Sequence, residues 1–287
     1  QRKAVDAIEG PVTVIAGPGT GKTHILTLRI ANILRQTDTT PDGILALTFT
    51  ESAVYSMRKR LVEIIGQSAY RVHIYTFHGF CNEVIRKHPE AFDRIIGSSN
   101  ISEIDQIKIM EKLVQETSLV TLKPFGDPLY YVRPVLRSIR ELKREDHSPE
   151  DLEMFIVKQE REFESIEDLH HTSGRYKGKM KGKYADVQKK IERNKELLIL
   201  YGKYEHILNE KRLYDYEDMI LETVRVLASN EDLLLRLEEQ YLYILADEHQ
   251  DANRAQNRLL ELLSSFHESP NLFVVGDGKQ AIFRFQG

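Results

Sequence analysis

The chain has 287 residues, of which 41% are hydrophobic and 29% charged, with a single cysteine and a formal net charge of −4. This length allows a substantial buried core and two domains, while the lone Cys81 excludes an internal disulfide framework and favours a reducing, cytoplasmic compartment. The charge gives no general attraction to polyanions, and no apolar run could span a bilayer or serve as a secretory signal, so we expect no membrane partner.

The first block, residues 1–88, alternates between strand-like and helical patterns. Short apolar runs of strand length cover residues 12–15, 44–48 and 72–76. Apolar residues recur at helical spacing over residues 25–34, 53–65 and 80–86. This alternation predicts an α/β domain with a parallel sheet.

A glycine-rich turn follows the first predicted strand and ends in a lysine and a threonine. The glycines allow a tight turn with inward N–H groups, Lys22 reaches phosphate oxygens, and the Thr23 hydroxyl is placed to bind Mg²⁺. The strand before the turn and the helix after it disfavour the alternative, a chance glycine-rich loop. The predicted phosphate loop comprises Ala16, Gly17, Pro18, Gly19, Thr20, Gly21, Lys22 and Thr23, with Ala16 where the strict pattern has glycine.

In the middle block, residues 89–212, the strand-like runs give way to charged, helix-forming sequence. Helical patterns cover residues 104–114, 134–143, 152–163 and 184–211. We therefore expect an all-helical insertion into the α/β domain, which would resume at residue 213.

A dense basic segment, residues 175–183, lies within this insertion. Its lysines, including Lys179 and Lys181, are of the kind that hold phosphates without distinguishing sequence. A solvated loop joining two helices is an equally good interpretation.

In the last block, two further strand-like runs deliver polar residues at their carboxyl ends. Residues 241–246 lead to Asp247 and Glu248, and residues 271–275 lead to a segment that contains Gln280. Asp247 would hold Mg²⁺ and Glu248 would activate the attacking water, whereas the alternative is an acidic first turn of a helix. The aromatic residues Phe283 and Phe285 fit either the core or a stacking surface. Helical patterns over residues 216–227 and 254–263 complete the block.

Six segments, in order, resemble the motifs of the UvrD, Rep and PcrA group of superfamily 1 DNA helicases. The resemblance covers the whole chain and implies a RecA-like P-loop NTPase domain interrupted by a helical domain. The segments are residues 1–5, 16–23, 46–50, 75–80, 247–253 and 274–286, which are similar to the glutamine motif and to motifs I, Ia, Ib, II and III.

The resemblance implies a role for each matching residue. Gln1 and His24 would join the phosphate loop in binding ATP, and Thr23 and Asp247 would bind Mg²⁺. Lys22, Glu248 and Gln280 would be catalytic. The residues expected at single-stranded DNA are Phe49, Phe77, His78, Phe283 and Phe285, with Lys179 and Lys181 at the duplex. Departures from the family pattern occur at His24, His249, Ala252 and Gln286.

The implied activity is ATP-dependent translocation along single-stranded DNA, 3′ to 5′ as in the family, with unwinding at duplex junctions. The second RecA-like domain of such helicases has no counterpart in this sequence, so we expect weak Mg·ATP binding and slow hydrolysis by the chain alone. A helicase subunit of a helicase-nuclease and an ATP-gated DNA clamp are the alternatives, and a small-molecule kinase is less well supported.

Overall fold

The computed structural model describes residues 2–17, 20–266 and 268–277. These residues form two compact units: the first comprises the chain up to Ile96 and from Met219 onward, and the second is Gly97–Asp218. The chain thus leaves the first unit once and returns to it once, as an insertion does. Both boundaries lie further along the chain than the predicted 88/89 and 212/213.

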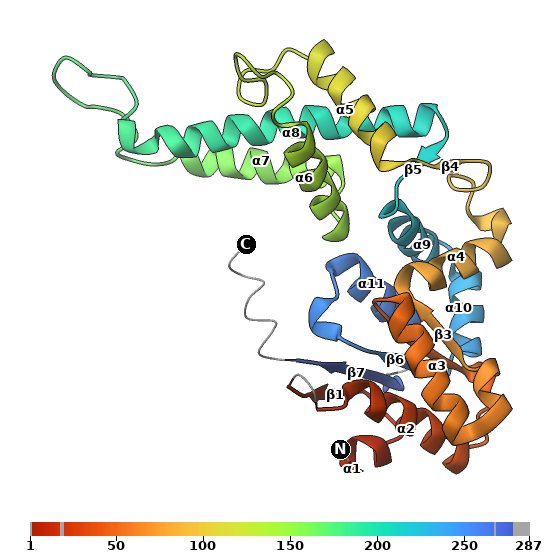
Figure 1. The fold of residues 1–287 in the computed structure, drawn as a ribbon. Coiled ribbons are helices and arrows are strands. Elements are labelled where there is room, and N and C mark those ends of the chain that lie inside the picture. Colours follow the sequence, from red (N-terminus) through yellow and green to blue (C-terminus); the bar gives the residue numbers. More distant parts are fainter. Residues whose placement is uncertain (1, 18–19, 267, 278–287) are drawn as a thin grey trace. The chain divides into compact units, whose positions relative to one another are not determined.

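A five-stranded parallel sheet forms the centre of the first unit (Figure 1). The strand order is β1-β7-β6-β2-β3, so β7 lies between β1 and β6. Because all the strands are parallel, the loops after β1, β6 and β7 leave the sheet at the same edge. The strands are β1 (Val12–Ile15), β2 (Ile44–Thr48), β3 (His73–Thr76), β6 (Tyr243–Ala246) and β7 (Leu272–Gly276). The α/β class and the parallel sheet are confirmed.

The helices of the first unit begin where the sequence provides capping residues. Thr50 and Thr76 accept the backbone N–H groups of Ala53 and Gly79, and Asn253 forms a capping box with Gln256. The helices are α1 (Arg2–Asp6), α2 (Lys22–Gln36), α3 (Glu51–Ile65), α4 (Phe77–Lys87), α9 (Asp218–Ser229), α10 (Glu231–Gln240) and α11 (Arg254–Leu263). Helix α10 was not predicted.

Both faces of the sheet are covered. On β6, Tyr243 and Leu245 belong to the buried cluster shared with α2 and α3. The intervening Ile244 and Ala246 are also buried and point to the opposite face, because successive strand residues alternate. Figure 1 shows α4 and α11 on that second side. Burial on both faces explains why the central strands β2 and β6 are continuous apolar runs, whereas alternate residues of β1 are exposed.

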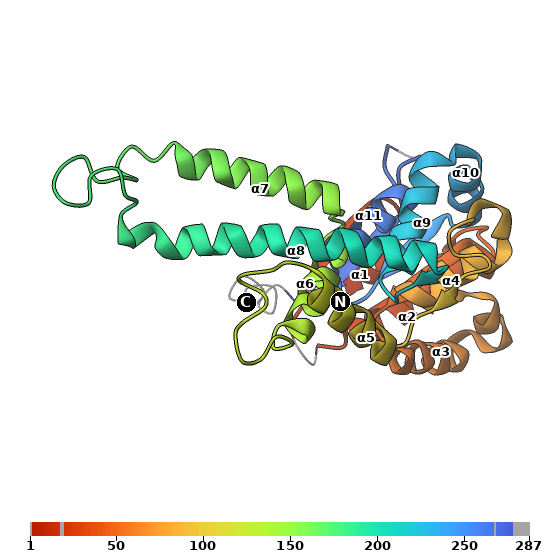
Figure 2. The same cartoon turned by 90° about the horizontal axis from the view of Figure 1, so that it is seen from above.

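The second unit is built from four helices around its own core. Figures 1 and 2 show α7 running alongside the long α8, and the buried cluster includes Met110, Leu200 and Tyr204. Ser148 and Asp151 form a capping box at the start of α7, with Pro149 at the first helical position. The helices are α5 (Glu103–Glu116), α6 (Val132–Arg144), α7 (Pro149–Glu164) and α8 (Ala185–Glu210).

A strand pair lies at the two ends of this inserted segment. Strand β4 (Ser99–Asn100) pairs in parallel with β5 (Leu213–Tyr214), and two isolated bridges, His170–Met180 and His171–Lys177, lie in the loop between α7 and α8. Two-residue strands carry no periodic pattern, and for this reason the sequence did not predict them. Among the described residues, no helix combines the length and the apolar character needed to cross a membrane.

Candidate functional site

The start of α2 meets the end of β6 at one edge of the sheet. Helix α2 begins at Lys22, after Gly21 in the left-handed conformation with φ 81° and ψ 34°. Lys22 Nζ lies 2.5 Å from Glu248 Oε2, and Thr23 Oγ1 donates to Asp247 Oδ2 at 2.8 Å. The neighbours Lys22 and Thr23 thus contact the neighbours Glu248 and Asp247, which lie 226 and 224 residues further along the chain.

Asp247 is a buried carboxylate with few compensating contacts. Its side chain receives hydrogen bonds from the Thr23 hydroxyl and from the backbone N–H of Glu248, at 2.8 and 2.9 Å. Burial is the largest influence on its pKa and raises it, despite these hydrogen bonds. A carboxylate whose charge is unfavourable and which lies beside a hydroxyl fits a Mg²⁺ ion, since hard cations prefer oxygen ligands.

Glu248 is held differently from its neighbour. Its backbone is left-handed, with φ 49° and ψ 38°, and its side chain is 38% exposed. Gln250 Nε2 donates to Glu248 Oε2 at 2.8 Å, so this carboxylate is fixed by both Lys22 and Gln250. A non-glycine residue in this conformation is uncommon and often marks a functional turn.

Gln250 connects Glu248 to the end of β7. Its Oε1 accepts the backbone N–H of Asp277 at 2.8 Å, while its Nε2 bonds to Glu248. A Cβ atom at Gly276 would lie only 2.9 Å from Gln250 Oε1 and 3.1 Å from Gln250 N. The close approach of β7 to Gln250 therefore favours glycine at position 276, because a larger residue would displace the Gln250 side chain. This link was missed, because no pattern in the sequence predicts a contact between the two segments.

The phosphate loop is partly described. The Ala16 N–H donates to Gly276 O at 2.9 Å, and Thr20 Oγ1 donates to Gly17 O at 2.7 Å. The His24 side chain is exposed. The predicted site residues Gln1, Pro18, Gly19, Gln280, Phe283 and Phe285 lie outside the described residues.

The residues expected to contact single-stranded DNA differ in accessibility. Phe49 and His78 are half-buried, whereas Phe77 is 1% exposed. The rings of Phe49 and Phe77 pack with their centroids 5.5 Å apart. In this structure Phe77 therefore supports Phe49 from the core and presents no free face.

The basic segment of the second unit lies in the loop between α7 and α8. Lys179 is exposed, with its Nζ 5.9 Å from the centre of the Tyr176 ring. Lys181 and Lys183 instead pair with Asp168, at 3.2 and 2.6 Å. Asp168 thus neutralises part of the positive charge of this loop.

Two residues that depart from the family pattern, His249 and Ala252, are at least partly buried. His249 Nδ1 is buried and has no hydrogen-bond partner within the part of the chain that the structure describes, and burial lowers the pKa of this imidazole. Ala252 is also buried, at 7% exposure. Neither residue contributes a charge to the site.

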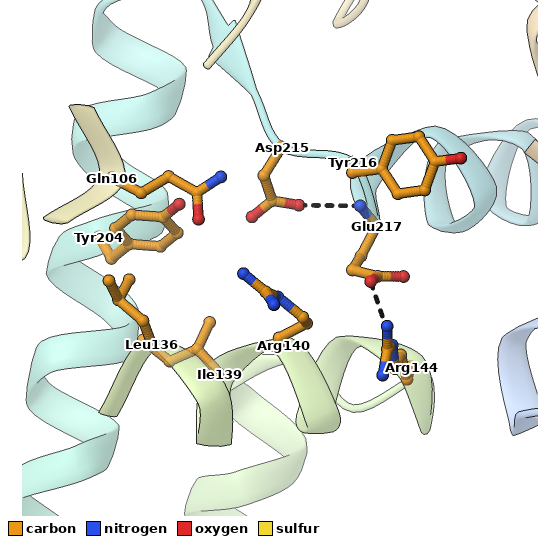
Figure 3. A pocket seen from close by; sticks show the side chains of 9 residues that line it. All are labelled: Gln106, Leu136, Ile139, Arg140, Arg144, Tyr204, Asp215, Tyr216 and Glu217. Carbon is orange, nitrogen blue, oxygen red and sulfur yellow. Dashed lines mark hydrogen bonds and ion pairs between the residues drawn. The ribbon is translucent and has the colours of Figure 1, made fainter. Parts of the chain in front are cut away.

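A charged pocket in the second unit was not predicted (Figure 3). It encloses about 160 Å³ and is lined by residues of α5, α6, α8 and the 215–217 segment. Within it Asp215 Oδ1 accepts the backbone N–H of Glu217 at 3.2 Å, and Arg144 Nε donates to Glu217 Oε1 at 3.1 Å.

Beside this pocket, Glu205, Asp215 and Asp218 form a cluster of the kind that could hold a metal ion. However, the ammonium group of Lys143 already contacts all three carboxylates, at 2.6, 2.6 and 2.8 Å. We therefore interpret the cluster as part of the structural core of this unit. The sequence places Lys143 at the end of the predicted helix 134–143 and gives no signal that its side chain is buried.

Comparison with known proteins agrees with this geometry. The UvrD/REP helicase N-terminal domain family matches residues 1–287. The chain is 32% identical over 290 residues to the ATP-dependent DNA helicase PcrA of Bacillus subtilis, covering all of this chain and 33% of that protein. It is 31% identical to a probable DNA helicase of Mycoplasma pneumoniae, of which it covers 47%, and 28% identical to PcrA of Staphylococcus aureus, of which it covers 34%.

The chain thus spans between a third and a half of the length of these curated relatives. It belongs to the UvrD/REP helicase N-terminal domain family.

Proposed function

We propose that, in this member of the family, the edge of the sheet binds Mg·ATP and hydrolyses it to drive movement along DNA. The observation that carries the proposal is the paired contact of Lys22 with Glu248 and of Thr23 with Asp247. These are the groups that phosphate binding, metal binding and water activation require, gathered from two distant segments.

Lys22 and Glu248 would exchange partners during the reaction. Lys22 pairs with Glu248, and the β- and γ-phosphates of ATP compete for the same ammonium group. Once Lys22 binds phosphate, the Glu248 carboxylate becomes free to orient the attacking water and to accept its proton. Gln250 keeps a hydrogen bond to Glu248 during this exchange and so limits how far the carboxylate moves.

Thr23 and Asp247 would hold the metal ion. Bound Mg²⁺ neutralises charge on the β- and γ-phosphates, and its charge would also offset the unfavourable burial of Asp247. Gln280, together with the nucleotide-binding residues Gln1 and His24, would complete the site on the basis of the family resemblance.

For the whole protein we propose translocation along single-stranded DNA, 3′ to 5′, and unwinding at duplex junctions. The single strand would contact Phe49, His78, Phe283 and Phe285, with Phe77 supporting the Phe49 ring. The relatives are DNA helicases by name, which supports this substrate. We expect the 287-residue chain alone to turn over ATP slowly, because arginines from a second motor domain typically contribute about 10³ to 10⁵ in rate.

The test is ATP turnover by the full-length protein, with and without single-stranded DNA, in the parent and in Glu248→Gln. We expect DNA to stimulate turnover, and the variant to lose at least about 10²-fold in rate while still binding ATP. Glu261→Gln, which alters an exposed ion pair with Arg258 on α11, is the matched control and should turn over normally. Turnover that ignores DNA, or that survives in Glu248→Gln, would contradict the proposal.

The basic loop gives a separate test of duplex binding. Lys179→Glu should weaken binding to a junction and reduce the slope of affinity against salt, by about one unit for each phosphate that is no longer neutralised. Lys181→Glu should have a smaller effect, since Asp168 already neutralises Lys181. Equal binding by the parent and Lys179→Glu at low salt would exclude the loop from the interface.

A further inference from the structure

Arg29 is a buried cation on the helix that carries the phosphate-binding residues. It lies on α2 seven residues after Lys22, or about 10 Å along the helix axis. Its side chain is 1% exposed, although it forms no ion pair among the described residues. A buried guanidinium must be compensated by other contacts, so its surroundings indicate what it holds in place.

Its partners are backbone carbonyls at the end of α1 and just beyond it. Nη1 donates to Ala4 O at 2.8 Å and also to Ala7 O, and Nη2 donates to Ile8 O at 2.9 Å. One turn further along α2, Asn32 Nδ2 donates to Val5 O at 3.0 Å. The last carbonyls of a helix have no partner within it, and here α2 provides those partners.

Arg29 also contacts the sheet. Its Cζ lies 4.4 Å from the centre of the Phe273 ring on β7, a cation–π arrangement. Burial lowers the pKa of Arg29 to about 10, so it remains a cation at neutral pH. One side chain thus joins the N-terminal segment, the phosphate-binding helix and the strand whose end contacts Gln250.

We propose that Arg29 is a positioning residue, which fixes the N-terminal segment beside the nucleotide and so sets discrimination for the adenine base. The inference rests on the proposed function, in which Gln1, directly before α1, would bind the adenine base of ATP, as the resemblance of residues 1–5 to the glutamine motif implies. Movement of α1 would then alter recognition of the base without altering the contacts of Lys22 and Thr23 with the phosphates.

Arg58 provides a matched control because it makes the same kind of contact elsewhere in this unit. It extends from α3, where Nη1 donates to Ala69 O and Val72 O at 2.7 and 2.8 Å. These carbonyls lie before β3, at the opposite end of the sheet order from β1. Arg58→Lys should therefore lower stability without altering nucleotide choice.

The experiment measures equilibrium binding of ATP, GTP and tripolyphosphate to the 287-residue chain and to Arg29→Lys, Arg58→Lys and Asn32→Ala. We expect Arg29→Lys to weaken ATP binding about tenfold, with less than about a twofold change for tripolyphosphate, as expected when recognition of the base is impaired. The preference for ATP over GTP should fall with it. Asn32→Ala should show a smaller change in the same direction, because Arg29 remains in place, and Arg58→Lys should show none.

The outcomes separate this inference from the proposed function. Equal weakening of ATP and tripolyphosphate in Arg29→Lys would assign Arg29 to general stability and overturn the inference. Equal binding of ATP and GTP by the parent would also overturn the inference. So would an unchanged preference for ATP in both Arg29→Lys and Asn32→Ala. In either case the proposed binding of phosphate by Lys22 and Thr23 would be unaffected. A parent chain that binds none of the three ligands would overturn the proposed function together with this inference. Should Arg29→Lys fail to fold, Asn32→Ala alone decides between these results.

Discussion

Each unit of the molecule buries a lysine, and the two lysines differ in how completely they are neutralised. Lys143, in the second unit, is 1% exposed and contacts Glu205, Asp215 and Asp218. Burial alone would lower its pKa, but the three carboxylates outweigh burial and raise the pKa well above the usual value. Lys22, in the first unit, is 8% exposed and pairs with Glu248, whose side chain is 38% exposed.

The difference distinguishes a lysine that holds a fold together from one that can exchange its partner at low cost. Removing Lys143 would leave several carboxylates buried together, so its contacts cannot be exchanged at low cost. The Glu248 carboxylate can be hydrated when Lys22 binds another group, because the Glu248 side chain is partly exposed. Burial of a charge therefore does not by itself indicate function, and the number and exposure of its partners must be considered too.

The largest effect we predict is on stability, in Lys143→Met. Loss of the ammonium group removes the cation shared by the half-buried Glu205 and the buried Asp215 and Asp218, which should lower the free energy of unfolding by about 3–5 kcal/mol. Urea denaturation would measure this loss. Lys203→Met, which removes a single hydrogen bond to Thr117 Oγ1, should cost no more than about 1.5 kcal/mol. Similar losses in the two variants would contradict a structural role for Lys143.

Lys22→Met should show the opposite behaviour. We expect the affinity for ATP to fall at least about tenfold, since the variant has no charged group to bind the phosphates at this position. Its free energy of unfolding should change by less than about 1 kcal/mol, because Glu248 reaches solvent. Calorimetric titration and urea denaturation test the two parts, and a large loss of stability would make Lys22 a structural lysine like Lys143.

A smaller effect is expected at Gly276, beside the site. Gly276→Ala places a methyl group against Gln250, which should cost about 1–3 kcal/mol and lower ATP turnover through the displaced Glu248. Gly202→Ala, in the middle of α8 with no atom within 4 Å of the added Cβ, should instead raise stability by about 0.5–1 kcal/mol. Thermal unfolding and turnover would be measured on both variants, and normal turnover in Gly276→Ala would remove the proposed role of Gln250.

The smallest effect concerns pH and sharpens the contrast with Lys143, whose charge is favoured by its surroundings. Burial raises the pKa of Asp247, so between the ordinary and the raised value the folded chain binds more protons than the unfolded chain. Stability from this group therefore falls as pH rises through that window and returns on acidification. Asp247→Asn should flatten this slope in unfolding measurements without Mg²⁺.

The exposed Asp105 provides a control of opposite sign. Hydrogen bonds from Ser102 and Lys108 lower its pKa, so its contribution to stability is lost as pH falls. Asp105→Asn should therefore reduce acid sensitivity. If Asp247→Asn shifted the pH profile in that same direction, the carboxylate would have to be well compensated in the folded chain.

The site elements with strong local patterns were predicted from the sequence. The strands 12–15 and 44–48 and the helix 254–263 agree with the structure residue for residue, because apolar runs and spacing determine them locally. The sequence also placed the phosphate loop and the pair Asp247 and Glu248 after predicted parallel strands, whose carboxyl ends lie at one edge of the sheet.

Contacts between distant side chains could not be predicted in this way. Arg29 lies between Leu28 and Ile30 on the apolar side of a predicted helix, and this was the one available signal that a charge is buried there. Neither its carbonyl partners nor the three partners of Lys143 follow from spacing, since they depend on how separate elements pack. Burial of Phe77 has the same origin, because a motif position does not specify which face of a helix is covered.

The strand order has a consequence for the growing chain on the ribosome. Among the described strands β1 is bonded only to β7, which comes last in the sequence and occupies a place inside the sheet. Residues 97–218 can complete their own core while β1 still lacks its neighbour. The loop that follows β1 would therefore lack this support until β7 has been synthesised, which happens after residues 97–218 have been made.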